Sequence, residues 1–174
     1  MTFASTAQIG EGFVGSGANA AHINTVLGRK GGAVEMAWAT ALATPRQGHT
    51  PFVAVLQPNL PVKPLTLFVN KADIRGERHA NLTWGAAQAG VASGVAAAVA
   101  DGIIPADETD ELLLIAAVWV DWAADDAHAV FENNARATRA ALEAGVQAAP
   151  SMEAVLAARH DPHNPFFAPA AIAR

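Results

Sequence analysis

His22 is the side chain of this sequence best suited to acid–base chemistry, because imidazole gives and takes protons near neutral pH. It follows a turn rich in glycine and lies where apolar and polar residues alternate, the pattern of a short β-strand. Small neighbours, Ala20 and Ala21, leave room beside the ring. The segment by itself fits a histidine that merely packs on a strand better than a catalytic one, so the rest of the chain must decide.

The elements that would position His22 follow from hydrophobic periodicity and from proline, glycine and capping residues. We predict strands over 11–15, 20–28, 51–56, 65–74 and 112–120, with a stiff proline-rich loop over 58–64. We predict helices over 31–43, from Asn81 or Thr83 to about 102, and from Asp125 or Asp126 to about 144. This order is not the strict alternation of a doubly wound parallel sheet, and it indicates an α/β fold with a mixed sheet layered with helices.

Length and composition set the class of protein. The 174 residues fit one domain, here 1–146, followed by a C-terminal tail, 147–174, that is helical around 152–159. A net charge of -5 without a cluster of Lys and Arg argues against nucleic acid as a partner. The longest strongly apolar run, 112–120, is too short to span a membrane, and the N-terminus lacks the pattern of a signal peptide. With no cysteine for disulfides or thiolate metal sites, we expect a cytoplasmic protein.

Two features indicate contacts between subunits. Only 16% of the residues are charged and 52% are hydrophobic, which leaves little polar surface to cover a monomer. The expected helix over 84–100 is Gly, Ala, Val and Ser nearly all round, so that it can approach its neighbours closely. Packing within the subunit and packing at a subunit interface explain that helix equally well.

Short motifs give this chain a family resemblance from residue 9 to about residue 144, without evident gaps. In order they are Gly10-Glu11-Gly12-Phe13-Val14-Gly15-Ser16-Gly17, Ala21-His22-Ile23-Asn24, Gly48-His49-Thr50, Pro58-Asn59-Leu60-Pro61-Val62-Lys63-Pro64, Asn70-Lys71, Gly85-Ala86-Ala87-Gln88, Gly102-Ile103-Ile104-Pro105-Ala106-Asp107-Glu108, Trp122-Ala123-Ala124-Asp125-Asp126 and Asn134-Ala135-Arg136-Ala137-Thr138. With these motifs the chain resembles the formaldehyde-activating enzyme family.

The resemblance implies a reaction of one-carbon metabolism, in which formaldehyde condenses with tetrahydromethanopterin to give methylene-tetrahydromethanopterin and water, without a metal. Hydroxide is a poor leaving group, so an acid that protonates it lowers the barrier to dehydration of the carbinolamine. The histidine proposed as this acid in the family corresponds to His22. The resemblance also implies an α/β sandwich like the second domain of ribosomal protein S5, assembled as a homopentamer.

Five further residues correspond to family positions around the pterin: Asn24, Val53, Lys71, Asp73 and Gln88. Lys71 and Gln88 match the family, and Val53 replaces a larger apolar leucine. Lys71 suits a carbonyl or acidic group of a ligand, or solvent at a strand end. Gln88, in an otherwise apolar helix, needs a partner for its amide, either the ligand or the backbone.

Two of these positions depart from the family, which has Asp in place of Asn24 and Thr in place of Asp73. Asn24 shares a strand face with His22, and Asp73 shares one with Lys71, so we expect both departures to line the pocket of His22. The two changes either relocate one carboxylate within the site or mark a protein with a different ligand. The alternatives to the family reaction are therefore a non-catalytic carrier or sensor of a pterin, formaldehyde or another small molecule, and a condensing lyase for a different substrate.

Other histidines give weaker signals. His160 and His163 have the spacing of a metal pair, but they lie in a proline-containing tail with no third ligand nearby in sequence, which favours a structural or surface role. His49 stands in the stretch that enters the third expected strand, where it has a minor chance of reaching the site. We therefore predict no metal site.

Overall fold

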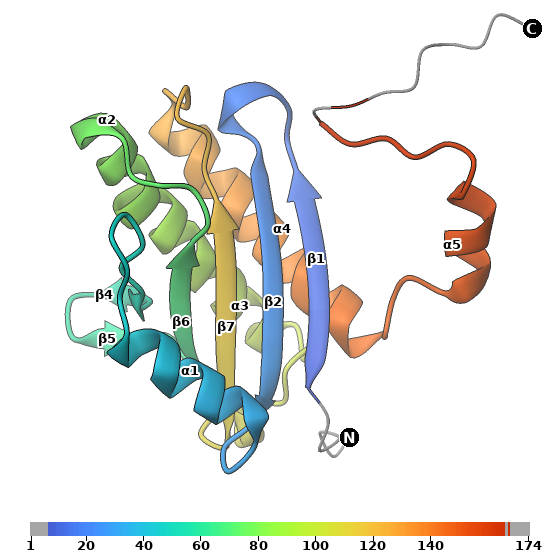
Figure 1. The fold of residues 1–174 in the computed structure, drawn as a ribbon. Helices are drawn as coiled ribbons and strands as arrows, with labels where there is room; N and C mark the ends of the chain where they lie inside the picture. Colours follow the sequence, from blue (N-terminus) through green and yellow to red (C-terminus); the bar gives the residue numbers. More distant parts are fainter. Residues whose placement is uncertain (1–6, 166, 168–174) are drawn as a thin grey trace, which may run out of the picture.

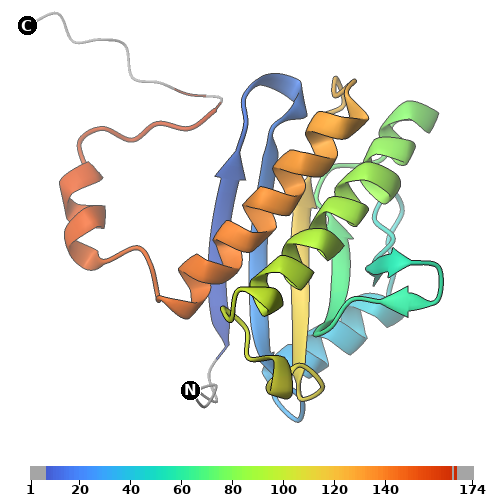
Figure 2. The same ribbon diagram turned by 180° about the vertical axis from the view of Figure 1, so that it is seen from behind.

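A five-stranded mixed sheet forms the centre of the protein. The structure is a computed structural model and describes residues 7–165 and 167. The strands lie in the order β1-β2-β7-β6-β3, with β6 parallel to β7 and the other neighbours antiparallel. Two long helices, α3 and α4, cover one face of the sheet, and α1 crosses the lower part of the other face (Figures 1 and 2). The predicted α/β fold with a mixed sheet is confirmed.

Four strands of the main sheet, β1, β2, β6 and β7, have six to nine residues, whereas β3, β4 and β5 have only two or three. Their bounds are Gln8–Val14 for β1, Ala21–Arg29 for β2, Phe52–Val53 for β3, Val55–Gln57 for β4, Leu60–Pro61 for β5, Leu65–Asn70 for β6 and Leu112–Trp119 for β7. The pair β4 and β5 forms a separate two-stranded ribbon. The helices are Ala33–Ala43 (α1), Gly76–Ala80 (α2), a π-helical segment Asn81–Ala87, Gln88–Ala100 (α3), Ala127–Val146 (α4) and Met152–Ala158 (α5).

Strand β2 shows how the sheet separates its two faces. Ala21, Ile23 and Leu27 are buried in the core under α3 and α4, while His22 and Asn24 alternate with them and are half-buried on the other face. At the end of the strand Gly28 faces α1, since a Cβ there would lie 2.6 Å from Val34 Cγ2. The face that carries His22 is therefore the one that α1 covers only in its lower part.

Glycines bring α4 unusually close to its neighbours. A Cβ at Gly12 of β1 would lie 2.3 Å from the Ala137 carbonyl oxygen, and one at Gly94 of α3 would lie 2.4 Å from the Ala135 carbonyl oxygen. Helix α4 begins where predicted, with Asp126 accepting hydrogen bonds from the backbone N–H groups of His128 and Ala129. The small residues of α3 on this side thus pack within the subunit against α4.

The predicted strand over 51–56 is present but divided into two short strands, and only Ala54 in it is fully buried. The chain makes only two residues of edge strand, β3, and then turns into the ribbon of β4 and β5, where Leu56 is 44% exposed. The Ala54 N–H still bonds to the Thr66 carbonyl, whereas its own carbonyl accepts from the Val62 N–H. After β3 the chain pairs with the proline-rich segment instead of with another strand of the main sheet. That segment was predicted as a loop, and it contains strand β5.

The helix predicted to start at Asn81 or Thr83 starts earlier, at Gly76. The buried side chain of His79 explains this, because its Nε2 donates to the Val120 carbonyl at 3.1 Å and its Nδ1 accepts from the Arg75 N–H. The continuous helical stretch Gly76–Ala100 is long and apolar enough, by length and composition alone, to cross a membrane, which the sequence analysis did not expect. It has a mean hydropathy of 1.2, and 56% of the window is buried inside the fold, as in a core helix.

The tail leaves the body of the protein at the end of α4. Helix α5 falls within the predicted helical stretch and lies beyond the β1 edge of the sheet (Figure 1). Met152 and Leu156 are 69% and 52% exposed. The division into a domain over 1–146 and a tail over 147–174 stays a prediction.

Candidate active site

The strand register brings three aromatic rings together on the open face of the sheet. Phe13 of β1 pairs with His22 of β2, which pairs in turn with Trp119 of β7. One step along the strands on the same face, Glu11 pairs with Asn24. Residues paired across strands point to the same side of the sheet, so these side chains form one continuous surface around His22.

His22 makes a close contact with a carboxylate. Its Nε2 lies 3.1 Å from Glu11 Oε1, and its side chain is 39% exposed. The Phe13 ring meets the imidazole edge-on, with ring centroids 6.2 Å apart and an interplanar angle of 61°. When Nε2 carries a proton it donates to Glu11, so that the carboxylate fixes the orientation of the ring.

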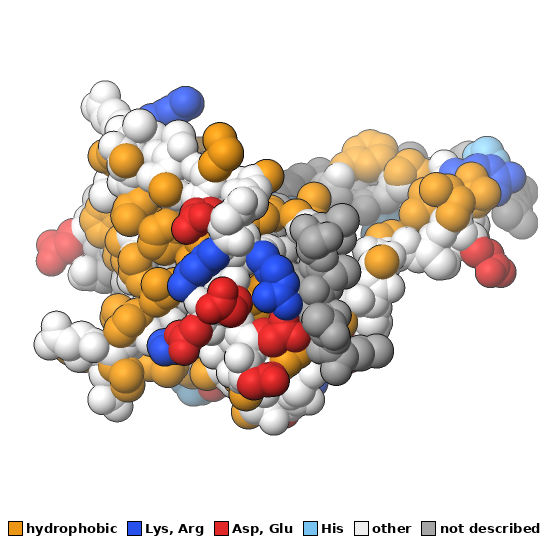
Figure 3. Space-filling view, turned by 90° about the horizontal axis from the view of Figure 1, so that it is seen from below, with side chains coloured by type: hydrophobic (Ala, Val, Ile, Leu, Met, Phe, Trp, Pro, Cys, Tyr) orange, Lys and Arg blue, Asp and Glu red, His pale blue; other side chains and the backbone are white. Residues whose placement is uncertain are grey.

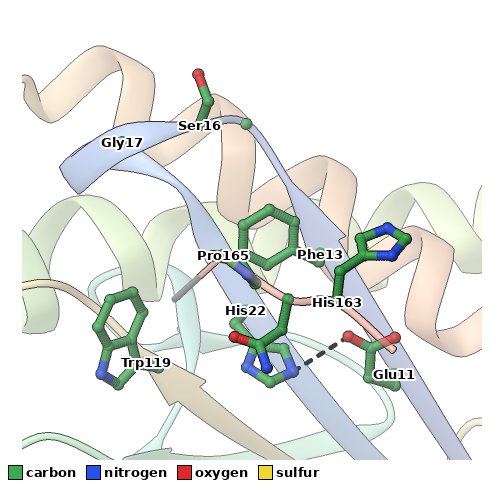
Figure 4. Close-up of a pocket in the computed structure, with 10 residues that line it drawn as sticks. Glu11, Phe13, Ser16, Gly17, His22, Trp119, His163 and Pro165 are labelled. Carbon is green, nitrogen blue, oxygen red and sulfur yellow. Dashed lines mark ion pairs between the residues drawn. The ribbon is translucent and has the colours of Figure 1, made fainter. Parts of the chain in front are cut away.

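A cavity of about 840 Å³ opens beside this histidine. Figure 4 shows Phe13 and Trp119 on either side of His22, with Glu11 joined to the imidazole by the ion pair. The tail contributes to the wall as well. The lining residues are Glu11, Phe13, Gly15, Ser16, Gly17, His22, Trp119, His163, Asn164 and Pro165. The arrangement offers an acid–base group in a recess flanked by two aromatic side chains, Phe13 and Trp119, which suits a flat ligand that must exchange a proton.

Lys71 reaches across the sheet to the same surface. It directly follows β6, where its backbone N–H donates to the Val118 carbonyl at 2.7 Å, and its ammonium donates to Asn24 Oδ1. Partial burial lowers the pKa of the Lys71 amine below its ordinary value, while the negative charge of Glu11 opposes part of this shift. The sequence placed His22 and Asn24 on one strand and Lys71 on another. In the structure Glu11 contacts His22 and its charge acts on the Lys71 amine, which donates to Asn24.

The other three predicted site residues lie elsewhere in the single chain. Val53 is half-buried on the edge strand β3, opposite Leu67. The Asp73 carboxylate lies 2.7 Å from His49 Nε2, and so it is directed to His49 and not to His22. Gln88 is buried in the helical layer, where its amide donates to the Val55 carbonyl at 2.8 Å.

Sequence reasoning missed Glu11, Phe13 and Trp119 as parts of the site. A signal for the first two was present, because Gly10 and Gly12 alternate with them and only one set can face the helices. Trp119 has no such local signal, since its place beside His22 depends on the pairing of β2 with β7.

The weaker histidine candidates lie in the tail and in the turn before β3. Among residues 7–165 and 167, no three His, Asp or Glu side chains gather so that they could hold a metal ion. His163 lines the cavity, and its Nδ1 lies 3.0 Å from the Asp161 carbonyl oxygen within the tail.

Fold and site together define the class: an α/β protein with a histidine–carboxylate pair and a nearby amine on an open sheet face, suited to acid–base catalysis on a small molecule. The family model described as formaldehyde-activating enzyme (Fae) matches residues 9–167. The chain belongs to the formaldehyde-activating enzyme family. Membership confirms the resemblance seen in the sequence, and it makes the chain a member of a family of lyases.

The curated relatives agree with this family. The chain is 43% identical over 159 residues to a 5,6,7,8-tetrahydromethanopterin hydro-lyase of Methanosarcina barkeri. This match covers 91% of this chain and 89% of the relative. It is 38% identical over 159 residues to a bifunctional enzyme Fae/Hps of Archaeoglobus fulgidus and 37% identical over 149 residues to one of Methanosarcina mazei. These matches span only 40% and 38% of the bifunctional proteins.

Proposed function

We propose that this chain condenses formaldehyde with tetrahydromethanopterin to methylene-tetrahydromethanopterin and water, with His22 as the general acid. The observation that carries the role of His22 is its Nε2 contact with Glu11, 3.1 Å away, on the wall of the aromatic cavity. The similarity to a tetrahydromethanopterin hydro-lyase over 89% of that enzyme's length supports the reaction.

The chemistry needs one acid and good positioning. A pterin amine adds to formaldehyde and gives a carbinolamine, whose hydroxyl takes a proton from His22 and leaves as water. The second amine then closes on the resulting iminium and loses its own proton, so that one CH₂O and two N–H groups become one N–CH₂–N bridge and one water. Glu11 orients the imidazole for the proton transfer, and holding the amines beside formaldehyde supplies the remaining acceleration.

Lys71 and Asn24 suit the polar edge of the pterin. The Lys71 ammonium donates to a carbonyl oxygen, and the Asn24 amide both donates and accepts. Val53, Asp73 and Gln88 are further proposed pterin contacts, by their correspondence with the family. Because Val53 and Gln88 do not line the cavity beside His22 in one chain, we propose that they meet the ligand from a second subunit.

A ring of subunits accounts for the exposed apolar surface. Ile9 is 68% exposed and Met36 is 73% exposed, and hydrophobic side chains cover much of one side of the molecule in Figure 3. A homopentamer of sandwiches like the second domain of ribosomal protein S5 is the assembly that we propose, located in the cytoplasm.

A second candidate function rests on Asn24. The family has a carboxylate there, whereas here the neutral amide oxygen accepts from Lys71. The chain would then bind a pterin or another small molecule as a carrier or sensor, or act as a lyase on a different substrate.

One experiment separates these candidates. Tetrahydromethanopterin is mixed with formaldehyde, with and without the protein, and methylene-tetrahydromethanopterin is followed by absorbance; binding of the pterin alone is measured by calorimetry. A rate well above the uncatalysed background supports the family reaction. Binding without acceleration supports a carrier or sensor, and the absence of both overturns the proposal and leaves a lyase for another substrate.

A further inference from the structure

The ring of His49 contacts two hydrogen-bond acceptors at the same time. Its Nδ1 lies 2.7 Å from the Asn70 carbonyl oxygen, and its Nε2 lies 2.7 Å from Asp73 Oδ1. A carbonyl oxygen and an ionised carboxylate only accept hydrogen bonds. Each ring nitrogen of His49 therefore faces a hydrogen-bond acceptor, and the two contacts hold the ring from both sides.

A tight turn presents His49 to the end of β6. Arg46 and His49 bond to each other through both backbone groups, at 3.0 and 2.9 Å, across Gln47 and Gly48. Gly48 has a φ of 76°, and a Cβ there would lie 3.0 Å from Asp73 Oδ1. The positive φ favours glycine, and the short distance shows that the turn lies directly against the Asp73 carboxylate.

The segment that this turn contacts, residues 70–73, carries Lys71. Asn70, on one side of Lys71, donates its amide to the carbonyls of Gly48 and Ala72, each at 2.8 Å. Asp73, on the other side, accepts from the Trp122 indole N–H at its backbone carbonyl, at 2.9 Å. The backbone is thus fixed on both sides of a lysine whose side chain must span β7 to reach Asn24.

We propose that His49 is a positioning residue, and that its ion pair with Asp73 fixes the segment 70–73 so that the Lys71 ammonium is held at Asn24. Asp73 accordingly serves the site by binding His49, in addition to its proposed contact with the pterin. Its effect on turnover rests on the proposed function; its effect on the Lys71 amine does not. Asp73 is 65% exposed at its side chain, so the ion pair contributes little to global stability, and its loss acts locally.

The first test needs no substrate. The parent, His49→Gln and Asp73→Asn are labelled for NMR, and the titration of the Lys71 amine is followed through its side-chain resonances, with His128→Gln as the control for loss of an exposed histidine. We expect both pair variants to shift the Lys71 pKa upward, toward its ordinary value, because a loosened segment returns the amine to water. His128→Gln should leave the Lys71 titration as it is in the parent.

An unchanged Lys71 titration in both variants, or the same shift in His128→Gln, overturns the proposal. Neither result bears on whether the protein condenses formaldehyde, so this inference and the proposed function fail separately.

The second test uses turnover. His49→Gln is expected to raise KM for the pterin roughly 5-fold with a smaller change in kcat, the size of one weakened hydrogen bond. In a Lys71→Met background the same change should have no further effect, because the residue through which it acts is gone. Additive effects of the two substitutions would show that His49 does not act through Lys71.

Discussion

Acid–base chemistry on this sheet depends on a few side chains that lie within contact of one another. His22 has Glu11 as its partner, Phe13 at its edge and Trp119 on the neighbouring strand. Because β1, β2 and β7 are paired by backbone hydrogen bonds, these groups are held before a ligand arrives. Such preorganisation is what a proton transfer to a poor leaving group requires.

Replacing His22 should remove the acid while leaving the fold intact. His22 is half-buried on the open face, outside the core under α3 and α4, so His22→Ala opens no cavity there. We expect the condensation rate above background to fall by about 10²- to 10⁴-fold, the usual contribution of a general acid. Steady-state assays alongside circular dichroism check this, and an Ala variant with the parent's rate would remove His22 from the mechanism.

The lowered pKa of Lys71 predicts the direction in which the stability of the fold changes with pH. Burial lowers its pKa in the folded state, so between that value and the unfolded value of 10.5 the unfolded chain binds more protons. The stability of the parent relative to Lys71→Met should therefore rise as pH increases through that interval, and it should be lowest at neutral pH. Urea denaturation of both proteins between pH 7 and about 11 tests this; a difference that does not change with pH, or that falls, contradicts the assignment.

At the scale of elements, the contact of β1 and α3 with α4 sets the core. Gly12 and Gly94 let backbone meet backbone, with the helix carbonyls closer than any Cβ could tolerate. Neighbouring positions on a strand point to opposite sides. The same contact therefore directs Glu11 and Phe13 to the open face of the sheet. Close packing on one face of β1 therefore determines the site on the other.

Adding a single methyl group at this contact should be costly. Gly94→Ala places its Cβ against the Ala135 carbonyl and Thr138, and we expect a loss of about 1–3 kcal/mol from overpacking. Gly85→Ala is the matched control, because a Cβ there meets nothing within 4 Å, and its effect should be neutral or slightly stabilising. Thermal unfolding measures both; equal midpoints for the two variants would show that α3 and α4 can move apart freely.

For the whole molecule, charge and apolar surface are distributed unequally. The end of the sheet far from His22 carries interleaved charges, where Arg29 pairs with Glu108 and Lys63 pairs with Asp110 (Figure 3). The hydrogen bond from Lys63 lowers the pKa of Asp110. Elsewhere large apolar side chains stand exposed on β1, α1 and α5, among them Ile9, Met36 and Met152.

Light scattering should therefore find an oligomer. Single exposed apolar residues are ordinary on a monomer, but several on different elements of a chain with only 16% charged residues indicate subunit contacts. We expect a particle of about five times the chain mass of 17.9 kDa at micromolar concentration. A monomer under these conditions would contradict the proposed ring and, with it, the contacts of Val53 and Gln88 from a second subunit.

The sequence by itself determined what depends on the local backbone. Period-two alternation placed His22 and Asn24 on one strand face, and the structure agrees. Asp125 and Asp126 marked the start of α4, and the apolar, small-residue composition of 84–100 marked a closely packed helix. The mixed sheet followed from the order of these elements, since two strands adjoining in sequence cannot form strict β–α–β units.

Only the tertiary structure decided which of these faces meet. Glu11 lies beside His22 because of the β1–β2 register, and Lys71 reaches Asn24 because β6 is parallel to β7 and only one strand away from β2. Asp73 shares a face with Lys71 by strand period, yet its carboxylate binds His49 from a turn 24 positions earlier in the chain. Strand order and register are set by the packing of the whole sheet against α3 and α4, and no local pattern encodes them.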